Sequence, residues 1–238
     1  MEPFVAEVIG TALLVIFGDG VVAGVLLNKT KAQNSGWIVI TTGWAMGVAI
    51  AVYAVGRISG AHLNPAVTLG LAAIGKFAWS SVSQYIAAQL MGAFLGAVVV
   101  WLAYLAHWPE TESQVSKLSV FSTVPAIRRS PHNLITEIIG TFVLVFGVLA
   151  ILANAAPAQS GLTSLLVGLL VWGIGLSLGA PTGYAINPAR DLGPRIAHAL
   201  LPIPGKGSSD WGYSWVPVVG PLIGGVLGAA AYAAWFMD

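Results

Sequence analysis

Asn64-Pro65-Ala66 recurs 123 residues later as Asn187-Pro188-Ala189, and this repeated tripeptide determines how the rest of the sequence is interpreted. Proline is favoured at the first position of a helix, and an asparagine before it can cap the free N–H groups. We therefore predict a short helix after each asparagine, over residues 65–74 and 188–201. A membrane span needs about 20 apolar residues, so neither helix can cross a bilayer alone.

The composition is that of a polytopic membrane protein. Hydrophobic residues make up 57% of the chain and charged residues 8%, with a mean hydropathy of +0.84. In soluble domains roughly a quarter of the residues are charged. The net charge of +1 argues against nucleic-acid binding, which requires a clustered basic face. The absence of cysteine excludes disulfides, thiolate nucleophiles and cysteine-ligated metals.

Long apolar runs predict six membrane spans. They cover about residues 4–27, 37–56, 82–107, 134–153, 162–178 and 215–236. The polar segment 108–131 is interpreted as a linker, and 154–160 as a turn. The linker divides the chain into a first repeat of about 1–107 and a second of about 132–238.

The two repeats share more than the tripeptide. Residues 6–11 (AEVIGT) correspond to residues 136–141 (TEIIGT). Three spans per repeat is an odd number, so the second copy enters the membrane with the opposite orientation. Inverted repeats with broken helices place a site at the bilayer midplane, on the N-termini of the half-helices. The predicted fold is an all-α membrane protein with six transmembrane helices, two re-entrant half-helices and inverted three-span repeats.

The segments around the tripeptides resemble a known family. Residues 59–68 (SGAHLNPAVT) and 183–191 (GYAINPARD) are similar to the signatures of the major intrinsic proteins, the aquaporins, and the resemblance covers essentially the whole chain. Asp191 directly after Arg190 resembles the glycerol-facilitator, or aquaglyceroporin, branch. Further positions match that branch: Tyr104, Arg195 and the pair Pro221-Leu222. Water-selective members usually carry a histidine where Gly175 stands.

The resemblance implies a single transmembrane channel domain over residues 1–238 and a homotetramer in which each protomer has its own pore. It implies that the half-helices enter from opposite faces and meet through their prolines. It places the selectivity filter at four residues: Trp44, Gly175, Tyr184 and Arg190. Tyr184 stands where the best-known glycerol facilitators carry phenylalanine. Its hydroxyl makes the slot more polar, which suits dihydroxyacetone or undissociated lactic acid as well as glycerol.

Asn64 and Asn187 are the central pore candidates. The N-terminus of a helix carries roughly half a positive charge, so two N-termini meeting in the membrane oppose the passage of cations. We expect each side-chain amide to donate to a passing hydroxyl or water, while its carbonyl oxygen binds backbone. The alternative is a purely structural cap.

Arg190 lies in a membrane segment, where an arginine is costly unless it faces water or a partner. Its planar fork of donors can hold hydroxyl groups in line and repel cations. We expect Trp44 and Tyr184 to offer apolar ring faces to the CH groups of a polyol, opposite these donors, and Gly175 to supply room. The alternatives are an interfacial arginine, a core tryptophan and a packing glycine.

Glu7 and Glu137 occupy equivalent places in the two repeats. We interpret them as scaffold groups that accept hydrogen bonds from the non-helical backbone before each half-helix, whose donors need partners. A proton relay is the alternative. Asp19 has no equivalent in the second repeat, where Leu149 stands, and no role is assigned to it.

The remaining candidates are polar groups near the half-helices. His62 is expected to line the inner vestibule and to contact a backbone carbonyl, with a pH sensor as the alternative. Asp191 and Arg195 lie one helical turn apart and are expected to form a structural ion pair. The four histidines show no metal-ligand spacing, so neither a metal nor another cofactor is predicted.

The predicted function is a passive channel for glycerol, related small neutral solutes and water, which excludes ions and protons. The expected partners are these polyol or acid permeants, water, the lipid bilayer and three further copies of the chain. A water-selective aquaporin is the near alternative, and a coupled secondary transporter, also built from inverted repeats, is a more distant one. No nucleophile–base arrangement points to an enzyme.

The family analogy implies a multi-pass plasma-membrane protein with both termini in the cytoplasm. The distribution of basic residues disagrees with it, because cytoplasmic loops usually carry the excess of lysine and arginine. The terminal side offers mainly Arg57 and Lys76. The loops on the other side hold more: Lys29, Lys31, Lys117, Arg128 and Arg129.

Overall fold

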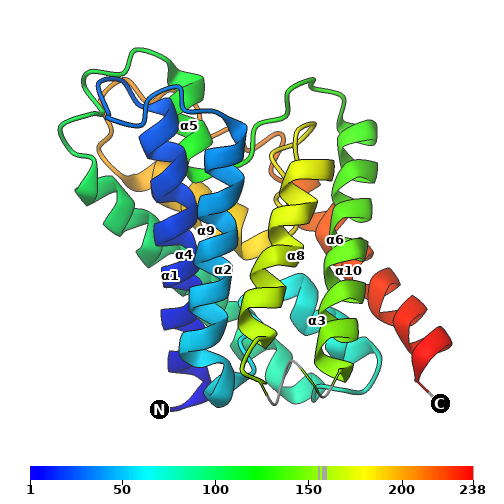
Figure 1. The fold of residues 1–238 in the computed structure, drawn as a ribbon. Helices are drawn as coiled ribbons and strands as arrows, with labels where there is room; N and C mark the ends of the chain where they lie inside the picture. Colours follow the sequence, from blue (N-terminus) through cyan, green and yellow to red (C-terminus); the bar gives the residue numbers. More distant parts are fainter. Residues whose placement is uncertain (155, 157–159, 238) are drawn as a thin grey trace.

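The computed structural model describes residues 1–154, 156 and 160–237, and Figure 1 shows their arrangement as a bundle of long helices. The long helices are α1 (Pro3–Leu26), α2 (Trp37–Ser59), α4 (Trp79–Ala103), α6 (Ser130–Ala153), α8 (Thr163–Leu178) and α10 (Val216–Phe236). Five of them are long and apolar enough to cross a membrane, and the sixth, α8, is a shorter apolar helix of 16 residues. This confirms the predicted all-helical membrane fold.

Two short helices lie inside the bundle, α3 (Pro65–Ala73) and α9 (Pro188–Leu200). In Figure 1, α3 lies in the half of the molecule near the two termini and α9 in the opposite half. Each begins at the proline of its tripeptide because the preceding asparagine caps it. The Oδ1 atom of Asn64 accepts from the backbone N–H of Ala66, and that of Asn187 from Ala189 and Arg190.

The inverted repeat governs how the long helices pack. Helix α4 lies against α1 in the same way as α10 lies against α6. A Cβ atom on Gly92 would lie only 2.3 Å from the carbonyl oxygen of Val8, and one on Gly224 would lie 2.3 Å from that of Ile138. Glycine at these two positions therefore lets the backbones of the paired helices touch.

The segment interpreted as a linker contains a further helix that was not predicted, α5 (Gln114–Phe121). The Ser113 hydroxyl caps it by accepting from the N–H of Ser116. Some predicted boundaries also differ. Helix α2 continues beyond residue 56 to Ser59, where the left-handed Gly60 ends it, and α4 ends at Ala103 rather than at residue 107. The turn predicted over residues 154–160 lies partly outside the described residues.

The outer surface of the bundle is apolar along its long helices. Large hydrophobic side chains such as Phe17, Ile50, Leu95 and Ile139 are exposed. Several charged and polar side chains are buried instead. This inside-out distribution fits a protein solvated by lipid, in which polar groups face the interior of the bundle.

Candidate functional site: a pore between the two half-helices

The chain leading into each half-helix has an unusual backbone. Ala61 and Leu63 have φ of 48° and 53°, and Tyr184 and Ile186, at the equivalent positions of the second repeat, have φ of 37° and 42°. A residue other than glycine in this left-handed region costs about 1–3 kcal/mol. The strain occurs at the same positions in both repeats, so each loop needs to be held by its surroundings.

Glu7 holds the first loop. Its Oε1 atom accepts from the His62 N–H (2.9 Å) and the Ser59 hydroxyl (2.6 Å). Its Oε2 atom accepts from the Leu63 N–H (2.7 Å) and the Gln89 side-chain amide (2.8 Å). The buried carboxylate therefore satisfies the donors of a loop whose carbonyl groups are free to face elsewhere.

Glu137 holds the second loop in the same way. Its Oε1 atom accepts from the Ala185 N–H (3.0 Å) and the Thr182 hydroxyl (2.6 Å), and its Oε2 atom from the Ile186 N–H (2.8 Å). Neither this carboxylate nor that of Glu7 lines the central cavity. These are the contacts of a scaffold. The supporting hydroxyls were missed by the sequence analysis, although Ser59 and Thr182 stand 123 residues apart, the spacing of the tripeptides.

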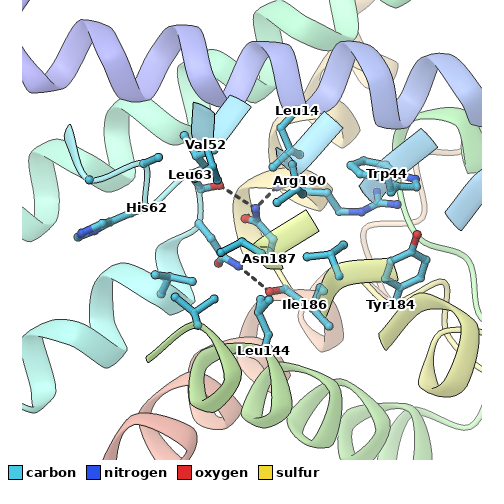
Figure 2. Close-up of a pocket in the computed structure, with 18 of the residues that line it drawn as sticks. Leu14, Trp44, Val52, His62, Leu63, Leu144, Tyr184, Ile186, Asn187 and Arg190 are labelled. Atoms are coloured by element: carbon cyan, nitrogen blue, oxygen red, sulfur yellow. Dashed lines mark hydrogen bonds between the residues drawn. The ribbon is translucent and has the colours of Figure 1, made fainter. Parts of the chain in front are cut away.

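The two loops are joined where the half-helices meet. The side-chain Nδ2 atom of Asn64 donates to the Ile186 carbonyl (2.7 Å), and that of Asn187 donates to the Leu63 carbonyl (2.8 Å), as Figure 2 shows. Each asparagine thus caps its own helix and binds the loop of the opposite repeat. One N–H of each amide is committed to protein, and the second N–H is left for a permeant. Both asparagines line the cavity.

The cavity at this junction has a volume of about 100 Å³. Part of its wall is apolar and comes from the long helices: Leu14, Val48, Val52, Leu144, Val148 and Val171. The two loops, over residues 60–64 and 184–187, and Arg190 also line it. The lining therefore combines aliphatic side chains with hydrogen-bonding groups.

Arg190 lies on the face of Trp44. Its Cζ atom is 4.0 Å from the centre of the Trp44 ring, and both side chains are buried. We expected the ring to stand opposite the guanidinium, and this expectation was wrong. A cation stacked on an aromatic face within about 6 Å is stabilised by the ring quadrupole, most strongly on tryptophan. The tryptophan therefore carries the arginine at the cavity wall (Figure 2).

Tyr184 forms the other aromatic part of the wall, and two glycines make room for it. A Cβ atom on Gly175 would lie 3.0 Å from the Tyr184 ring and 3.0 Å from the Thr41 methyl group, and Gly179 is closer still. Gly175 is not itself among the residues that line the cavity. The Tyr184 hydroxyl is buried and has no hydrogen-bond partner within the described part of the chain.

Trp37 contacts both Gly175 and Tyr184, and it was not among the residues predicted from the sequence. Its Nε1 atom donates to the Gly175 carbonyl (3.0 Å), and its ring stands edge-on to Tyr184 at 5.7 Å. The residue stands at the N-terminus of α2, 138 positions from Gly175 along the chain. No local pattern in the sequence connects the two.

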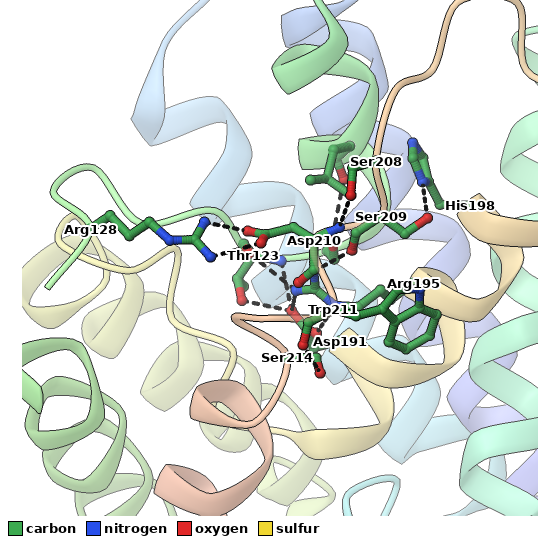
Figure 3. Close-up of polar contacts among 12 residues, drawn as sticks. Thr123, Arg128, Asp191, Arg195, His198, Ser208, Ser209, Asp210, Trp211 and Ser214 are labelled. Carbon is green, nitrogen blue, oxygen red and sulfur yellow. Dashed lines mark hydrogen bonds and ion pairs between the residues drawn. The ribbon is translucent and has the colours of Figure 1, made fainter. Parts of the chain in front are cut away.

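Asp191 and Arg195 form the expected ion pair, and the pair does more than support its own helix. Arg195 donates through Nε to Oδ1 (2.8 Å) and through Nη2 to Oδ2 (3.0 Å) of Asp191. Asp191 also accepts from the N–H and hydroxyl of Thr123, both at 2.7 Å, and Arg195 donates to the Ser209 carbonyl. Figure 3 shows how this buried pair joins two outer loops to α9.

The other residues that resemble branch markers lie away from the cavity. The Tyr104 hydroxyl donates to the Gly20 carbonyl (3.1 Å) and so ties the end of α4 to α1. Pro221 is buried inside α10, and Leu222 follows it. These residues contribute to the packing of the helices and do not form the pore surface.

His62 lines the cavity as part of the first loop. Its Nδ1 atom lies 3.1 Å from the Thr68 hydroxyl, and its ring packs against Phe77 and Tyr85 at 4.6 and 4.9 Å. The expected contact with a backbone carbonyl was therefore wrong. Among the described residues, no group of three or more histidine or acidic side chains could hold a metal ion.

One outer-loop ion pair gives a stability prediction. Arg128 donates to both carboxylate oxygens of Asp210 (2.6 and 2.7 Å) and lies 5.4 Å from the Tyr213 ring. Because 53% of the Arg128 side chain is exposed, we expect Arg128→Gln to lower the free energy of unfolding by only about 0.5–1 kcal/mol.

Thermal unfolding in detergent at low and high salt measures this effect, which should shrink at high salt. Arg129→Gln is the control, because the exposed Arg129 side chain makes no hydrogen bond or ion pair within the described residues. Equal destabilisation by the two substitutions would show that the Arg128–Asp210 pair contributes nothing.

Comparisons with known proteins agree on one family. The family model described as "Major intrinsic protein" matches residues 1–232. The "Probable glycerol uptake facilitator protein" of Thermotoga maritima is 65% identical over 98% of both chains. The "Glycerol uptake facilitator protein" of Bacillus subtilis is 60% identical over 99% of this chain and 85% of the relative. The aquaglyceroporin from Plasmodium falciparum superposes with a TM-score of 0.83 at 30% identity, over 96% of this chain and 93% of that one.

Proposed function

Because this chain belongs to the major intrinsic protein family, we propose that it is a passive channel that lets glycerol and other small neutral solutes cross a membrane. The observation that carries the proposal is the mixed lining of the cavity. It combines aliphatic side chains such as Leu14 and Val48 with a hydrogen-bonding stripe formed by the loops and Arg190. A polyol has CH groups and hydroxyl groups along one short chain, and it can satisfy both kinds of lining at once.

The hydrogen-bonding stripe offers both kinds of partner. Leu63 and Ile186 already use their carbonyls to bind the asparagine amides, so the other loop carbonyls and the asparagine N–H groups remain for the solute. Arg190 adds a donor-rich group, and no side-chain hydrogen bond of Arg190 is found in the described part of the chain. A hydroxyl group needs a donor and an acceptor in succession, and this stripe supplies them.

Ion exclusion follows from a positive electrostatic potential that the helix N-termini and Arg190 create in the cavity. The N-termini of α3 and α9 meet at the crossed asparagine bonds, and each carries roughly half a positive charge. Arg190 adds a full charge beside them. A cation in this region meets this repulsion, while a neutral solute or water does not.

The solute range is set by Tyr184 in this proposal. Its hydroxyl stands at the cavity wall without a protein partner among the described residues. We extend the range to water, dihydroxyacetone and undissociated lactic acid on that ground. A relative in Lactiplantibacillus plantarum that is 42% identical over 100% of this chain carries the name "D/L-lactic acid transporter".

Two other functions fit the site less well. A coupled transporter would need a titrating carboxylate in the pathway, but the carboxylates of Glu7 and Glu137 lie behind the loops and are occupied by backbone donors. A water-selective pore would need a narrower passage than one in which Gly175 leaves room for Tyr184. The relatives are facilitators rather than enzymes, and no catalytic step is proposed.

We also propose that the channel is a homotetramer in the plasma membrane, with both termini in the cytoplasm. The termini lie at the same end of the molecule (Figure 1). The excess of basic residues at the other end runs against this orientation by the positive-inside rule, so the orientation is proposed from the family alone. Three of these basic residues make local contacts: Lys29 pairs with Glu110, Arg128 pairs with Asp210, and Lys117 donates to the Pro204 carbonyl.

Stopped-flow light scattering on proteoliposomes tests the proposed function. Vesicles are offered water, glycerol, dihydroxyacetone and lactic acid at low pH, with and without a protonophore. Glycerol flux well above that of empty vesicles, unaffected by the protonophore, is expected. Flux of water alone would favour a water-selective pore, and flux abolished by the protonophore would favour a coupled transporter.

Tyr184→Phe is expected to change solute preference without closing the channel. Removing the hydroxyl deletes one hydrogen bond to a polar permeant, worth about 0.5–1.5 kcal/mol. The ratio of dihydroxyacetone to glycerol permeability should therefore fall by roughly two- to tenfold. The same stopped-flow assay measures the ratio, and Tyr53→Phe, an exposed tyrosine on α2, serves as the control. Unchanged solute ratios would remove the Tyr184 hydroxyl from the filter.

A further inference from the structure

Asp19 is the buried carboxyl group that the site described above does not use. It lies in α1, its side chain is inaccessible to solvent, and neither of its oxygens has a hydrogen-bond partner within the described part of the chain. The other buried carboxylates, Glu7, Glu137 and Asp191, are each held by several donors. A buried polar group without a partner is destabilising, so this one calls for an explanation.

The position of Asp19 connects it with the cavity wall. Its neighbour Gly18 packs directly on the Trp44 ring, where a Cβ atom on the glycine would lie 2.2 Å from the Cε3 and Cζ3 atoms. Trp44 in turn carries the Arg190 guanidinium on its face. Asp19 therefore stands one residue from the contact that supports the stacked pair.

Arg190 and Asp191 are the charged groups that act on Asp19. Asp191 accepts hydrogen bonds from two nitrogens of Arg195. The Nη1 atom of Arg190 is buried without a hydrogen-bond partner. Two carboxyl oxygens and one guanidinium nitrogen thus remain unsatisfied in the same region of the protein interior.

These groups do not touch, because no hydrogen bond or ion pair joins Asp19 to Arg190 among the described residues. Buried water commonly satisfies such groups, since it can accept from one and donate to the other. We propose that Asp19 is a positioning residue for the filter, which holds the Arg190 guanidinium against Trp44 through at least one buried water molecule. That water accepts from Nη1 and donates to the carboxyl group.

The consequence concerns the permeant. With Nη1 held from behind the wall, the guanidinium keeps a fixed orientation and its other donors remain aimed at the cavity. Without Asp19, the guanidinium is held only by the Trp44 ring and can swing into the passage. Glycerol fills more of the passage than water does, so glycerol flux should fall more than water flux. This inference rests on the proposed filter role of Arg190.

The test compares variants of the full-length protein in proteoliposomes. Asp19→Ala removes the acceptors, and Asp19→Asn keeps the shape and one acceptor but replaces the other oxygen by an NH₂ donor. We expect Asp19→Ala to lower the ratio of glycerol to water permeability by at least about threefold, within the range for one lost hydrogen bond, and Asp19→Asn to lower it less. Thr11→Val is the control, because the Thr11 hydroxyl is also buried in α1 without a partner.

A double-mutant cycle separates positioning from general destabilisation. If Asp19 acts through Arg190, Asp19→Ala should not change the permeability ratio further in an Arg190→Val background. A ratio in Asp19→Ala equal to that of the wild type, or an equal change in both backgrounds, would overturn the proposal. A structural role alone would lower the melting temperature and leave the ratio unchanged.

The proposal can also be tested on the wild-type protein, without any substitution. An experimental structure that locates ordered water should show a molecule within hydrogen-bond distance of both the Asp19 carboxyl and Arg190 Nη1, and a dry gap or a direct ion pair would contradict the proposal. Wild-type glycerol flux is read separately. Absence of that flux would contradict the proposed function, whereas the position of the water would still decide the role of Asp19.

Discussion

Arg190→Val is expected to make the channel leak protons and small cations. The guanidinium places a full positive charge in the cavity wall, 4.0 Å from the centre of the Trp44 ring. Two unit charges about 4 Å apart interact by about 4 kcal/mol at an effective dielectric constant of 20. Losing only a third of that barrier would raise proton conductance about tenfold. Valine also widens the passage, so water flux should be retained or increased.

A pH-sensitive dye inside proteoliposomes measures the leak, and water flux measured on the same vesicles gives the amount of open channel. Arg57→Val is the matched control, since it removes an equal charge from an exposed position at the end of α2. Its proton conductance should equal that of the wild type. An Arg190→Val channel that conducts water but remains tight to protons and cations would contradict the proposed role of the guanidinium.

The double substitution Trp44→Phe with Gly175→His is expected to exclude glycerol while water still passes. A histidine at position 175 cannot fit behind Tyr184, because even a Cβ atom there would lie 3.0 Å from the Tyr184 ring and the Thr41 methyl group. The new side chain must push the tyrosine into the cavity or enter the cavity itself. Phenylalanine at position 44 offers a smaller face to Arg190.

We expect glycerol permeability to fall about tenfold or more, the scale on which a pocket discriminates by size, with water permeability changed far less. Gly173→His is the control on the same helix, because a Cβ atom there meets nothing within 4 Å. Glycerol flux at the wild-type rate in the double variant would show that the narrow part of the pore lies elsewhere.

Part of the fold was predictable from the sequence because it depends on interactions between residues close together in the chain. Asn64 and Asn187 start their helices by accepting hydrogen bonds from residues two or three positions further on, so the sequence alone locates both starts. The lengths of the apolar runs identify the long helices in the same way. Helix α5 was missed because its eight residues, Gln114–Phe121, carry no long apolar run.

The candidate site was predictable in its membership and less so in its geometry. The family resemblance brought Trp44, Tyr184 and Arg190 together, but it placed the tryptophan opposite the arginine instead of beneath it. Trp37 was not found, since its partner Gly175 lies 138 positions away. No role could be assigned to Asp19 from the sequence, because its role depends on the absence of hydrogen-bond donors around it in the folded protein.

The sequence by itself determined the two half-helices, the six apolar helices around them, the inverted repeat and the family. Each of these depends on contacts within a few residues or on the matching of the two halves. Only the tertiary structure decided that Arg190 lies on the Trp44 ring, that Gly175 acts behind Tyr184, and that the carboxyl of Asp19 is buried without a partner. Stacking, steric room and unsatisfied burial are set by segments distant along the chain, and no local pattern encodes the distance between them.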